Sequence, residues 1–354
     1  MFDLQRLIHT VQCNCHISDA RYAGQYSMCI FLLKMREYYR WEQDLPLSAR
    51  IPARAVGDWL AQREQTWESL ERRDFHPLPL DGGQVDPFDQ ARVNAQLVPQ
   101  GYIYSSGYGM FRKPNFFLAE LKHHETRDGF TIYVADEEYA RDLVANPAML
   151  RGRSIFVRRD AIRRHLWEKV EEWRWRGDPE APMALALKAY GEGIDAEVLL
   201  DRMTEQETEF VIAHELGEGR AGTLLGPEWE QMLSALAGGR AEFVARAVRD
   251  HLADCLSTLP RLLEVAHPGA LHFFFANFTG MRRALFPELL EAYQAWRTGG
   301  STRALAETIE QGRSFWYQLA ERLLEHHRLE GAAVAARLEA LPEARPPLSS
   351  RLGH

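Results

Sequence analysis

Residues 115–134 read Asn115-Phe-Phe-Leu-Ala-Glu-Leu121, then Lys-His-His-Glu-Thr-Arg-Asp128-Gly129, then Phe130-Thr-Ile-Tyr-Val134. The first and last of these segments are rich in aromatic and β-branched residues, which favour β-strands. Asp128 and Gly129 suit the turn between them, because Asp and Gly tolerate the positive φ angles of a tight hairpin. The stretch therefore predicts an antiparallel β-hairpin, and this hairpin decides the fold class.

Further strands are expected on both sides of the hairpin. The segments 101–104 and 154–157 have a similar aromatic and β-branched composition. A short helix is expected at 137–144, after the second strand of the hairpin. Residues 76–158 are therefore predicted to form a small α+β unit built on an antiparallel β-meander.

The chain before this unit has a helical pattern. Apolar residues recur at three- and four-residue steps in two segments, 26–41 and 54–73, which predicts two amphipathic helices. Residues 1–75 are therefore predicted to be a helical N-terminal segment. The two prolines and two glycines of His76-Pro-Leu-Pro-Leu-Asp-Gly-Gly83 predict a linker directly after it.

The chain after residue 158 is predicted to be helical. Glycines and prolines interrupt the helical pattern at 177–179, 217–222, 238–239, 268–269 and 299–300. These breaks divide residues 159–340 into the helices of one larger domain. A proline- and serine-rich tail, 341–354, is expected to be flexible. The predicted fold class is α+β, with a helical N-terminal segment, a small antiparallel β-meander and a C-terminal all-helical domain.

Composition and charge exclude several classes of protein. The 354 residues include 46% hydrophobic and 26% charged residues, which is typical of a folded protein and unlike a disordered or fibrous chain. The net charge of -8 excludes a whole-protein electrostatic surface for nucleic acid or anionic membrane. The N-terminus has no signal-peptide pattern, and no uncharged apolar stretch approaches about 18 residues. The sequence therefore predicts a cytoplasmic protein without membrane association.

The sharpest local signal for chemistry is Glu209-Phe-Val-Ile-Ala-His214-Glu215-Leu-Gly-Glu218. This segment resembles the zinc-binding helix of zincin metalloproteases, in which two histidines one turn apart bind zinc and a glutamate between them is the general base. Glu218 replaces the second histidine here, so peptidase activity does not follow from the resemblance. His214 and Glu218 still project from one helix face, and a carboxylate is a metal ligand. The glycines that follow predict that Glu218 lies at a helix end.

A second pair of candidate ligands, His251 and Asp254, lies on a single predicted helix of the C-terminal domain. Their neighbours are apolar, so both side chains are expected to enter the core. Together with His214 and Glu218 they would form a site of two histidines and two carboxylates suited to Zn, Fe or Mn. Glu215 would be the general base if the ion activates water. The alternative is a structural network in which these residues bond to one another and hold no ion.

Two other regions offer weaker signals. Cys13, Cys15 and His16 place soft ligands close together, but paired Cys-x-x-Cys motifs are absent, and small core residues are the simpler interpretation. Six arginines between 151 and 164 precede three tryptophans between 167 and 175, a combination that can hold phosphates and stack bases. Acidic residues alternate with these arginines at ion-pair spacing, which favours a solvated helix face.

Two pairs of segments resemble an uncharacterised bacterial protein family with a domain of unknown function. They are Cys15-His-Ile-Ser-Asp-Ala-Arg21 with Leu33-Lys-Met-Arg-Glu-Tyr-Tyr-Arg-Trp41, and Arg249-Asp-His-Leu-Ala-Asp254 with Leu271-His-Phe-Phe-Phe-Ala-Asn-Phe-Thr-Gly-Met281. The resemblance extends over most of the chain and implies no activity. The leading prediction is a metal-dependent enzyme, a hydrolase or an oxidoreductase, acting on a small molecule. The alternatives are a non-catalytic interaction or scaffold protein with a protein partner, and a nucleic-acid-binding protein that uses the arginine- and tryptophan-rich patch.

Overall fold

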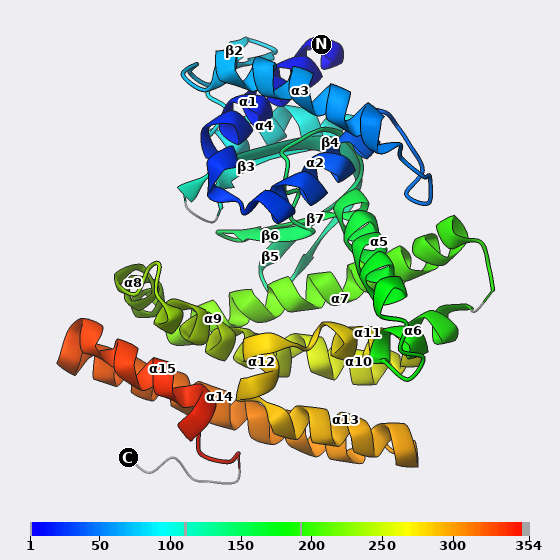
Figure 1. Ribbon diagram of the computed structural model, residues 1–354. Helices are drawn as coiled ribbons and strands as arrows, with labels where there is room; N and C mark the ends of the chain where they lie inside the picture. The colour runs from blue at the N-terminus through cyan, green and yellow to red at the C-terminus, as the bar shows by residue number, and fades with distance from the viewer. Residues whose placement is uncertain (1, 110–111, 192, 349–354) are drawn as a thin grey trace. The chain divides into compact units, whose positions relative to one another are not determined.

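The chain forms two compact units, one built around a β-sheet and one helical (Figure 1). The computed structural model describes residues 2–109, 112–191 and 193–348. The sheet unit consists of Met1–Lys169 with Asp195–Thr204, and the helical unit consists of Val170–Ile194 with Glu205–His354. The fold class is therefore α+β, as the sequence predicts.

The sheet unit contains helices and strands of very different lengths. Its helices are α1 (Leu4–Tyr22), α2 (Met28–Glu42), α3 (Ala53–Leu70), α4 (Gln90–Leu97) and the first part of α5 (Arg159–Arg176), with 3-10 turns at Ala23–Gln25 and Val98–Gln100. Its strands are β1 (Leu78–Leu80), β2 (Gly83–Val85), β3 (Tyr102–Tyr108), β4 (Pro114–Arg127), β5 (Phe130–Arg141), β6 (Ala148–Arg151) and β7 (Ser154–Arg158).

The larger sheet has the strand order β3-β4-β5-β7-β6. Strands β3, β4 and β5 pair antiparallel, which confirms the predicted meander. In the turn from β4 to β5, Asp128 and Gly129 have the positive φ angles expected of them, 52° and 76°. β7, the further strand that the sequence predicts at 154–157, pairs parallel with β5, with Ile155 opposite Ile132, so the complete sheet is mixed. The reason is that β6 takes the sheet edge and β7 returns antiparallel to it, between β6 and β5.

Two local predictions in this unit are wrong. The helix predicted at 137–144 is largely the second half of β5, where Ala140 pairs with Leu118 of β4. The linker predicted at 76–83 contains β1 and the turn to β2, and Leu78 and Leu80 are buried. In both cases contacts with residues distant in the sequence decide the conformation, and such contacts are not contained in a local pattern.

Helix α1 packs its apolar stripe against the larger sheet. Leu7, Val11 and Cys15 recur at four-residue steps and share one buried cluster with Phe116 and Leu118 of β4. These side chains lie on one helix face because four residues make about one helical turn. The predicted helical N-terminal segment and the predicted α+β unit therefore lie together in one compact unit.

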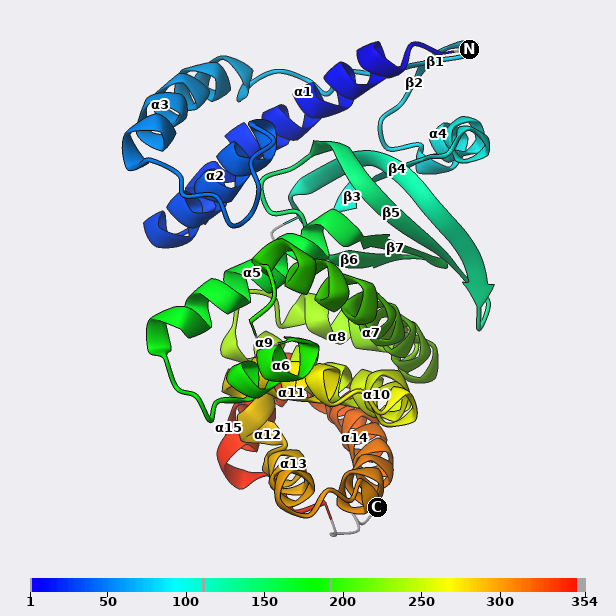
Figure 2. The same ribbon diagram turned by 90° about the vertical axis from the view of Figure 1, so that its right-hand side faces the viewer.

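The helical unit contains the second part of α5, the part of α7 from Glu205 onward, and the elements that follow. Its helices are α6 (Pro182–Gly191), α7 (Ala196–Leu225), α8 (Pro227–Ala235), α9 (Arg240–Ala253), α10 (Leu259–Val265), α11 (Pro268–Asn277), α12 (Gly280–Leu285), α13 (Pro287–Gly299), α14 (Arg303–Glu330) and α15 (Val334–Ala344). A π-helical turn covers Asp254–Thr258, and a 3-10 turn covers Gly331–Ala333. α13 and α14 lie side by side (Figure 2).

Helix α7 is longer than the sequence predicts. It continues to Leu225 through the glycine-rich segment 217–222, although an interior glycine costs about 1 kcal/mol of helix stability relative to alanine. A Cβ atom at Gly217 would collide with the carbonyl oxygen of Ala253, so α7 and α9 approach closely at this point. Glu218 therefore lies inside a helix, and the prediction that it lies at a helix end is wrong.

The single helix predicted around His251 and Asp254 is divided. α9 ends at Ala253, the π-helical turn begins at Asp254, and α10 begins at Leu259. A π-helical turn contains more residues than an α-helical turn, so it changes which side chains share a face. The backbone N–H of Asp254 still bonds to the carbonyl oxygen of Asp250 in the α-helical pattern, so the irregularity changes the faces of the residues that follow Asp254.

Part of the tail predicted to be flexible is helical. α15 extends to Ala344 and includes Pro342, and Leu348 is buried. Residues 349–354 of the predicted tail lie outside the described residues. Among the helices that the structure describes, none is both long enough and apolar enough to cross a membrane.

Candidate functional site

The candidate site in the helical unit is centred on His214 of α7 and Asp254 of the π-helical turn. The Nδ1 atom of His214 lies 3.1 Å from the Oδ1 atom of Asp254. Asp254 is buried, and its second carboxylate oxygen accepts a hydrogen bond from Arg282 of α12. The His214 side chain keeps 32% of its surface exposed. A buried carboxylate therefore orients a histidine that a ligand can still reach.

Glu218 lies one turn beyond His214 on α7. Its Oε1 atom is 3.6 Å from the Nε2 atom of His214, which is longer than a normal hydrogen bond. The same Oε1 atom is 3.4 Å from the Nη2 atom of Arg249 on α9. Arg249 and Arg282 thus each pair with one of the two carboxylates that face His214. The structure brings three of the four predicted ligands together: His214, Glu218 and Asp254.

His251 lies in an aromatic part of the core. Its ring stacks on Trp316 at a centroid distance of 4.7 Å and meets the edges of Phe278 and Phe286. Neither ring nitrogen has a hydrogen-bond partner of regular geometry among the described residues. Burial and the nearby charge of Arg282 lower the pKa of His251 to about 3, so its ring is neutral. Its ring contacts are aromatic, and its interaction with the other predicted ligands is the effect of the Asp254 charge.

Protonation of His214 is favoured by its surroundings. Burial alone would lower the pKa of His214, but the interactions of its ring with the Asp254 and Glu218 carboxylates outweigh burial and raise this pKa well above its usual value. Burial alone would raise the pKa of Asp254, but Arg282 and His214 lower it to about 2. The cluster therefore favours a positive charge between two carboxylates, and a proton on His214 supplies it when no other cation is bound.

Asp250 is a member of this neighbourhood that sequence reasoning missed. It lies on α9, one turn before Asp254, and its backbone carbonyl oxygen accepts a hydrogen bond from the backbone N–H of Asp254. Burial raises the pKa of its carboxyl, although the charge of His214 acts in the opposite direction. The four-residue spacing from Asp254 is the sequence signal that could have found it.

Glu215, the predicted general base, is half-buried next to His214 on α7. One residue corresponds to about 100° around a helix, so Glu215 starts from a different face than His214 and Glu218. In the described ranges, no group of three or more His, Cys, Asp or Glu side chains is arranged to hold a metal ion. The cluster thus presents two candidate ligands, His214 and Glu218, and Asp254 orients the histidine.

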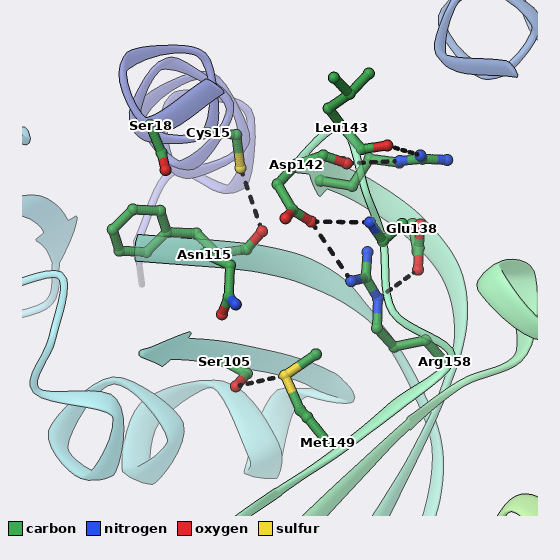
Figure 3. A network of polar contacts seen from close by, with 12 residues as sticks. Cys15, Ser18, Ser105, Asn115, Glu138, Asp142, Leu143, Met149 and Arg158 are labelled. Carbon is green, nitrogen blue, oxygen red and sulfur yellow. Dashed lines mark hydrogen bonds and ion pairs between the residues drawn. The ribbon is translucent and has the colours of Figure 1, made fainter. Parts of the chain in front are cut away.

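A second ionic cluster is buried in the sheet unit (Figure 3). Glu138 of β5 accepts hydrogen bonds from Arg158 of β7, at 2.7 Å, and from Arg164 of α5. Burial alone would raise the pKa of Glu138, but Arg158 and Arg164 lower it to about 2. One buried carboxylate therefore stabilises two guanidinium groups.

Asp142 connects this group to a second buried pair. Its carboxylate lies 3.7 Å from Arg158 and 3.8 Å from Lys113, and Lys113 also pairs with Asp19 of α1. Sequence reasoning missed the whole cluster, because its members come from separate elements and have no common spacing. The cluster holds α1, the sheet and α5 together.

The three N-terminal candidates Cys13, Cys15 and His16 have different surroundings. Cys15 is buried and donates its Sγ–H to the carbonyl oxygen of Phe116 at 3.3 Å (Figure 3). Cys13 lines a cavity of about 410 Å³. The Nε2 atom of His16 lies 2.8 Å from Arg63. Cys15 is thus a core residue, in line with the simpler interpretation.

The arginines of the predicted nucleic-acid patch bond within the chain. Arg158 and Arg164 pair with Glu138, and Arg159 pairs with Asp136 at 3.0 Å. The remaining contacts are those of Arg151 with Asn115, Arg153 with the carbonyl oxygen of Gly129, and Arg163 with Glu197 and Asp201. Arg158 and Arg164 are buried in the network around Glu138, so these two arginines do not belong to a solvated helix face.

The fold and these clusters define an α+β protein with a sheet unit and a helical unit, each with its own buried ionic network. The chain belongs to the family of unknown function DUF6866: its N-terminal domain matches residues 6–158 and its C-terminal domain matches residues 163–345. This match confirms the predicted resemblance to an uncharacterised family. No curated protein and no solved structure matches the chain. The local resemblance to the zincin helix has no support from these comparisons.

Proposed function

We propose that the protein is a metal-dependent enzyme whose ion is held by His214 and Glu218. The orientation of His214 supports the proposal: Nδ1 faces Asp254, and Nε2 faces Glu218 at 3.6 Å. With the proton on Nδ1, the lone pair of Nε2 points toward the Glu218 carboxylate. Two ligands that each lie about 2.0–2.2 Å from one zinc ion are about 3.4 Å apart at a tetrahedral angle, close to this separation.

The proposal changes two roles that the sequence suggests. Asp254 would act from the outer shell, because a histidine that binds a metal usually donates its other ring N–H to a carboxylate. His251 would not be a ligand, since its ring lies among Trp316, Phe278 and Phe286. Asp250, whose carboxyl is close enough to be affected by the charges of His214 and Glu218, would be the candidate for a third ligand.

The remaining ligand positions would be open to water and substrate, as in catalytic metal sites. Imidazole and carboxylate ligands suit Zn, Fe or Mn. Arg249 and Arg282 lie beside the ligands and would favour an anionic small-molecule substrate. Hydrolysis and oxidation are both compatible with this set, and in hydrolysis Glu215 would take a proton from the metal-bound water.

The second candidate function is a non-catalytic interaction or scaffold protein. The ion pairs of Arg249 with Glu218 and of Arg282 with Asp254 favour it, because they already compensate both carboxylates. A proton on His214 would then take the place of the metal ion. The cluster would serve only to join α7, α9 and α12.

Metal analysis of the purified protein separates the two candidates. We expect about one equivalent of a first-row transition metal per chain when the protein is prepared without chelators. His214→Ala should abolish this content while the far-UV circular dichroism spectrum is retained, because the substitution removes the only nitrogen ligand of the proposed site.

His251→Phe is the matched control, because it removes a buried histidine from the same unit but keeps an aromatic ring against Trp316. It should retain the metal. A wild-type protein that contains no metal, and that shows no saturable binding of Zn²⁺, Mn²⁺ or Fe²⁺, would favour the scaffold over the enzyme. Equal loss of metal in both variants would contradict the proposed ligand set.

A further inference from the structure

A cavity of about 410 Å³ lies beside α1 in the sheet unit, and its volume is within the range of small-molecule sites. One side of it is lined by Arg6, His9, Thr10 and Cys13 of α1. These residues recur at three- and four-residue steps, so they lie on one helix face, next to the apolar stripe that packs against the sheet. Arg6 and His9 are exposed, so a ligand can reach both side chains from solvent.

The other side of the cavity is formed by the segment that leads into the β1–β2 hairpin. It is lined by His76, Pro77, Pro79 and Gln84. The side chain of Asn14 holds this segment against α1, because Nδ2 donates to the carbonyl oxygen of His76 at 2.8 Å and Oδ1 accepts from the backbone N–H of His76 at 2.7 Å. Pro79 pairs with Gln84 across the two strands. Both walls are therefore fixed by contacts within the chain, and the cavity forms without a ligand.

The polar groups of this wall suit an anion. None of the described residues that line the cavity is acidic, although the chain has 50 Asp and Glu residues against 42 Lys and Arg residues. Within the described residues, the hydrogen bonds of Arg6 and His76 use backbone atoms, so the guanidinium and imidazole groups keep their donors for a ligand. Burial raises the pKa of the Cys13 thiol, and the charge of Arg73 acts in the opposite direction, so a further cation lies near this wall.

The same wall also has apolar surface. Pro77 and Pro79 contribute rigid pyrrolidine rings, and Pro77 is exposed. The half-buried thiol of Cys13 lines the cavity from the opposite side. The cavity is larger than a single phosphate or carboxylate group, so it has room for an organic part beside the anionic group.

We propose that this cavity binds a small organic anion. The phosphate or carboxylate group of the ligand accepts hydrogen bonds from Arg6 and from the imidazole rings of His9 and His76, and the organic part lies against Pro77 and Pro79. Hydrogen bonds from a guanidinium group to such oxygens are strong because both partners are charged. The site lies in the sheet unit and does not depend on the metal proposal for the helical unit.

NMR titration of the full-length protein at constant ionic strength tests this proposal. The probes are phenyl phosphate and benzoate, with benzamide as a neutral probe of similar shape to benzoate. We expect at least one of the two anions to bind saturably and to shift the ring signals of His9 and His76, which are assigned by their loss in His9→Asn and His76→Asn. The tighter anion tells whether the site prefers phosphoryl or carboxylate oxygens. Benzamide should bind at least about 10-fold more weakly than this anion, because it carries no charge.

Arg6→Gln should weaken binding of the tighter anion by about 10-fold, the effect of losing one hydrogen bond to a charged group. Arg92→Gln is the matched control, because Arg92 is also exposed, belongs to α4 of the same unit and does not line the cavity. It should bind the anion as the wild type does.

Three results overturn the proposal: no saturable binding of either anion, equally tight binding of benzamide, or equal effects of Arg6→Gln and Arg92→Gln. If Arg6→Gln does not fold, the ring signals of the wild type decide. Selective shifts of His9 and His76 support the site. Shifts of the exposed His123 and His124 of β4 without shifts of His9 and His76 overturn it.

Discussion

Replacing Glu138 with Gln is expected to lower the free energy of unfolding of the sheet unit by about 3–5 kcal/mol, the usual cost of breaking a buried ion pair on one side. The carboxylate is buried and is shared by Arg158 and Arg164, so the substitution leaves two buried guanidinium groups without their common anion. Urea denaturation followed by circular dichroism measures the loss. Hydrogen exchange of β4 and β5 assigns it to the sheet unit.

Asp136→Asn is the matched control on the same strand. Asp136 pairs with Arg159 at 3.0 Å, but 47% of its side chain is exposed, so the change should cost no more than about 1 kcal/mol. If both substitutions had equally small effects, the buried network would not be the main polar contribution to the stability of this unit.

The lowered pKa of Glu138 also predicts that the folded protein loses stability in acid. Its pKa is lowered from 4.5 to about 2 in the folded protein, so the unfolded chain binds more protons at intermediate acidity. The stability that Glu138 contributes is therefore present above about pH 4.5 and is lost as the pH falls toward 2. The wild type should lose stability over this range more steeply than Glu138→Gln.

Replacing Glu207 with Gln should raise the stability of the helical unit at pH 8. Glu207 of α7 is buried, and the hydroxyl of Tyr190 donates a hydrogen bond to it at 2.8 Å. Burial raises the pKa of Glu207 to about 8, despite the hydrogen bond from Tyr190. The folded state therefore holds a proton that the unfolded state has lost, and stability falls as the pH rises from about 4.5 to 8.

The expected size follows from 1.36 kcal/mol per pKa unit, which gives at most about 3–4 kcal/mol between pH 5 and pH 8. Glutamine cannot ionise, so the melting temperature of Glu207→Gln should vary less with pH and should exceed that of the wild type at pH 8. Glu209→Gln, which removes a partly exposed ion pair with Arg261, should leave the pH dependence unchanged. A wild-type profile that stays flat between pH 5 and 8 would contradict a protonated Glu207.

The parts of the fold that depend on local pattern are predictable from the sequence. The β4–β5 hairpin follows from strand composition and from the Asp128-Gly129 turn, and the helical C-terminal part follows from its periodicity. The errors occur where tertiary contacts override local preference. α7 passes through Gly217 because a close approach to Ala253 requires a residue without a Cβ atom, whereas glycine alone indicates a helix end.

The candidate site is predictable to a similar extent. His214 and Glu218 share one face of α7 because of their four-residue spacing. Asp254 follows the last residue of α9, and its carboxylate lies beside the His214 ring. The surroundings of His251 cannot be derived from spacing, because they depend on which segments pack beside α9. The buried cluster of Glu138, Arg158 and Arg164 is formed by residues from separate elements, and only the three-dimensional structure assembles it.

Anomalous diffraction from crystals grown with Zn²⁺ or Mn²⁺ tests whether His214 and Glu218 hold a metal ion. We expect a peak about 2.0–2.3 Å from Nε2 of His214 and from the Glu218 carboxylate, with Asp254 still bonded to Nδ1 and no peak beside His251. Crystals with no peak at His214, in which Arg249 and Arg282 keep their pairs with Glu218 and Asp254, would contradict it and leave a structural ionic network.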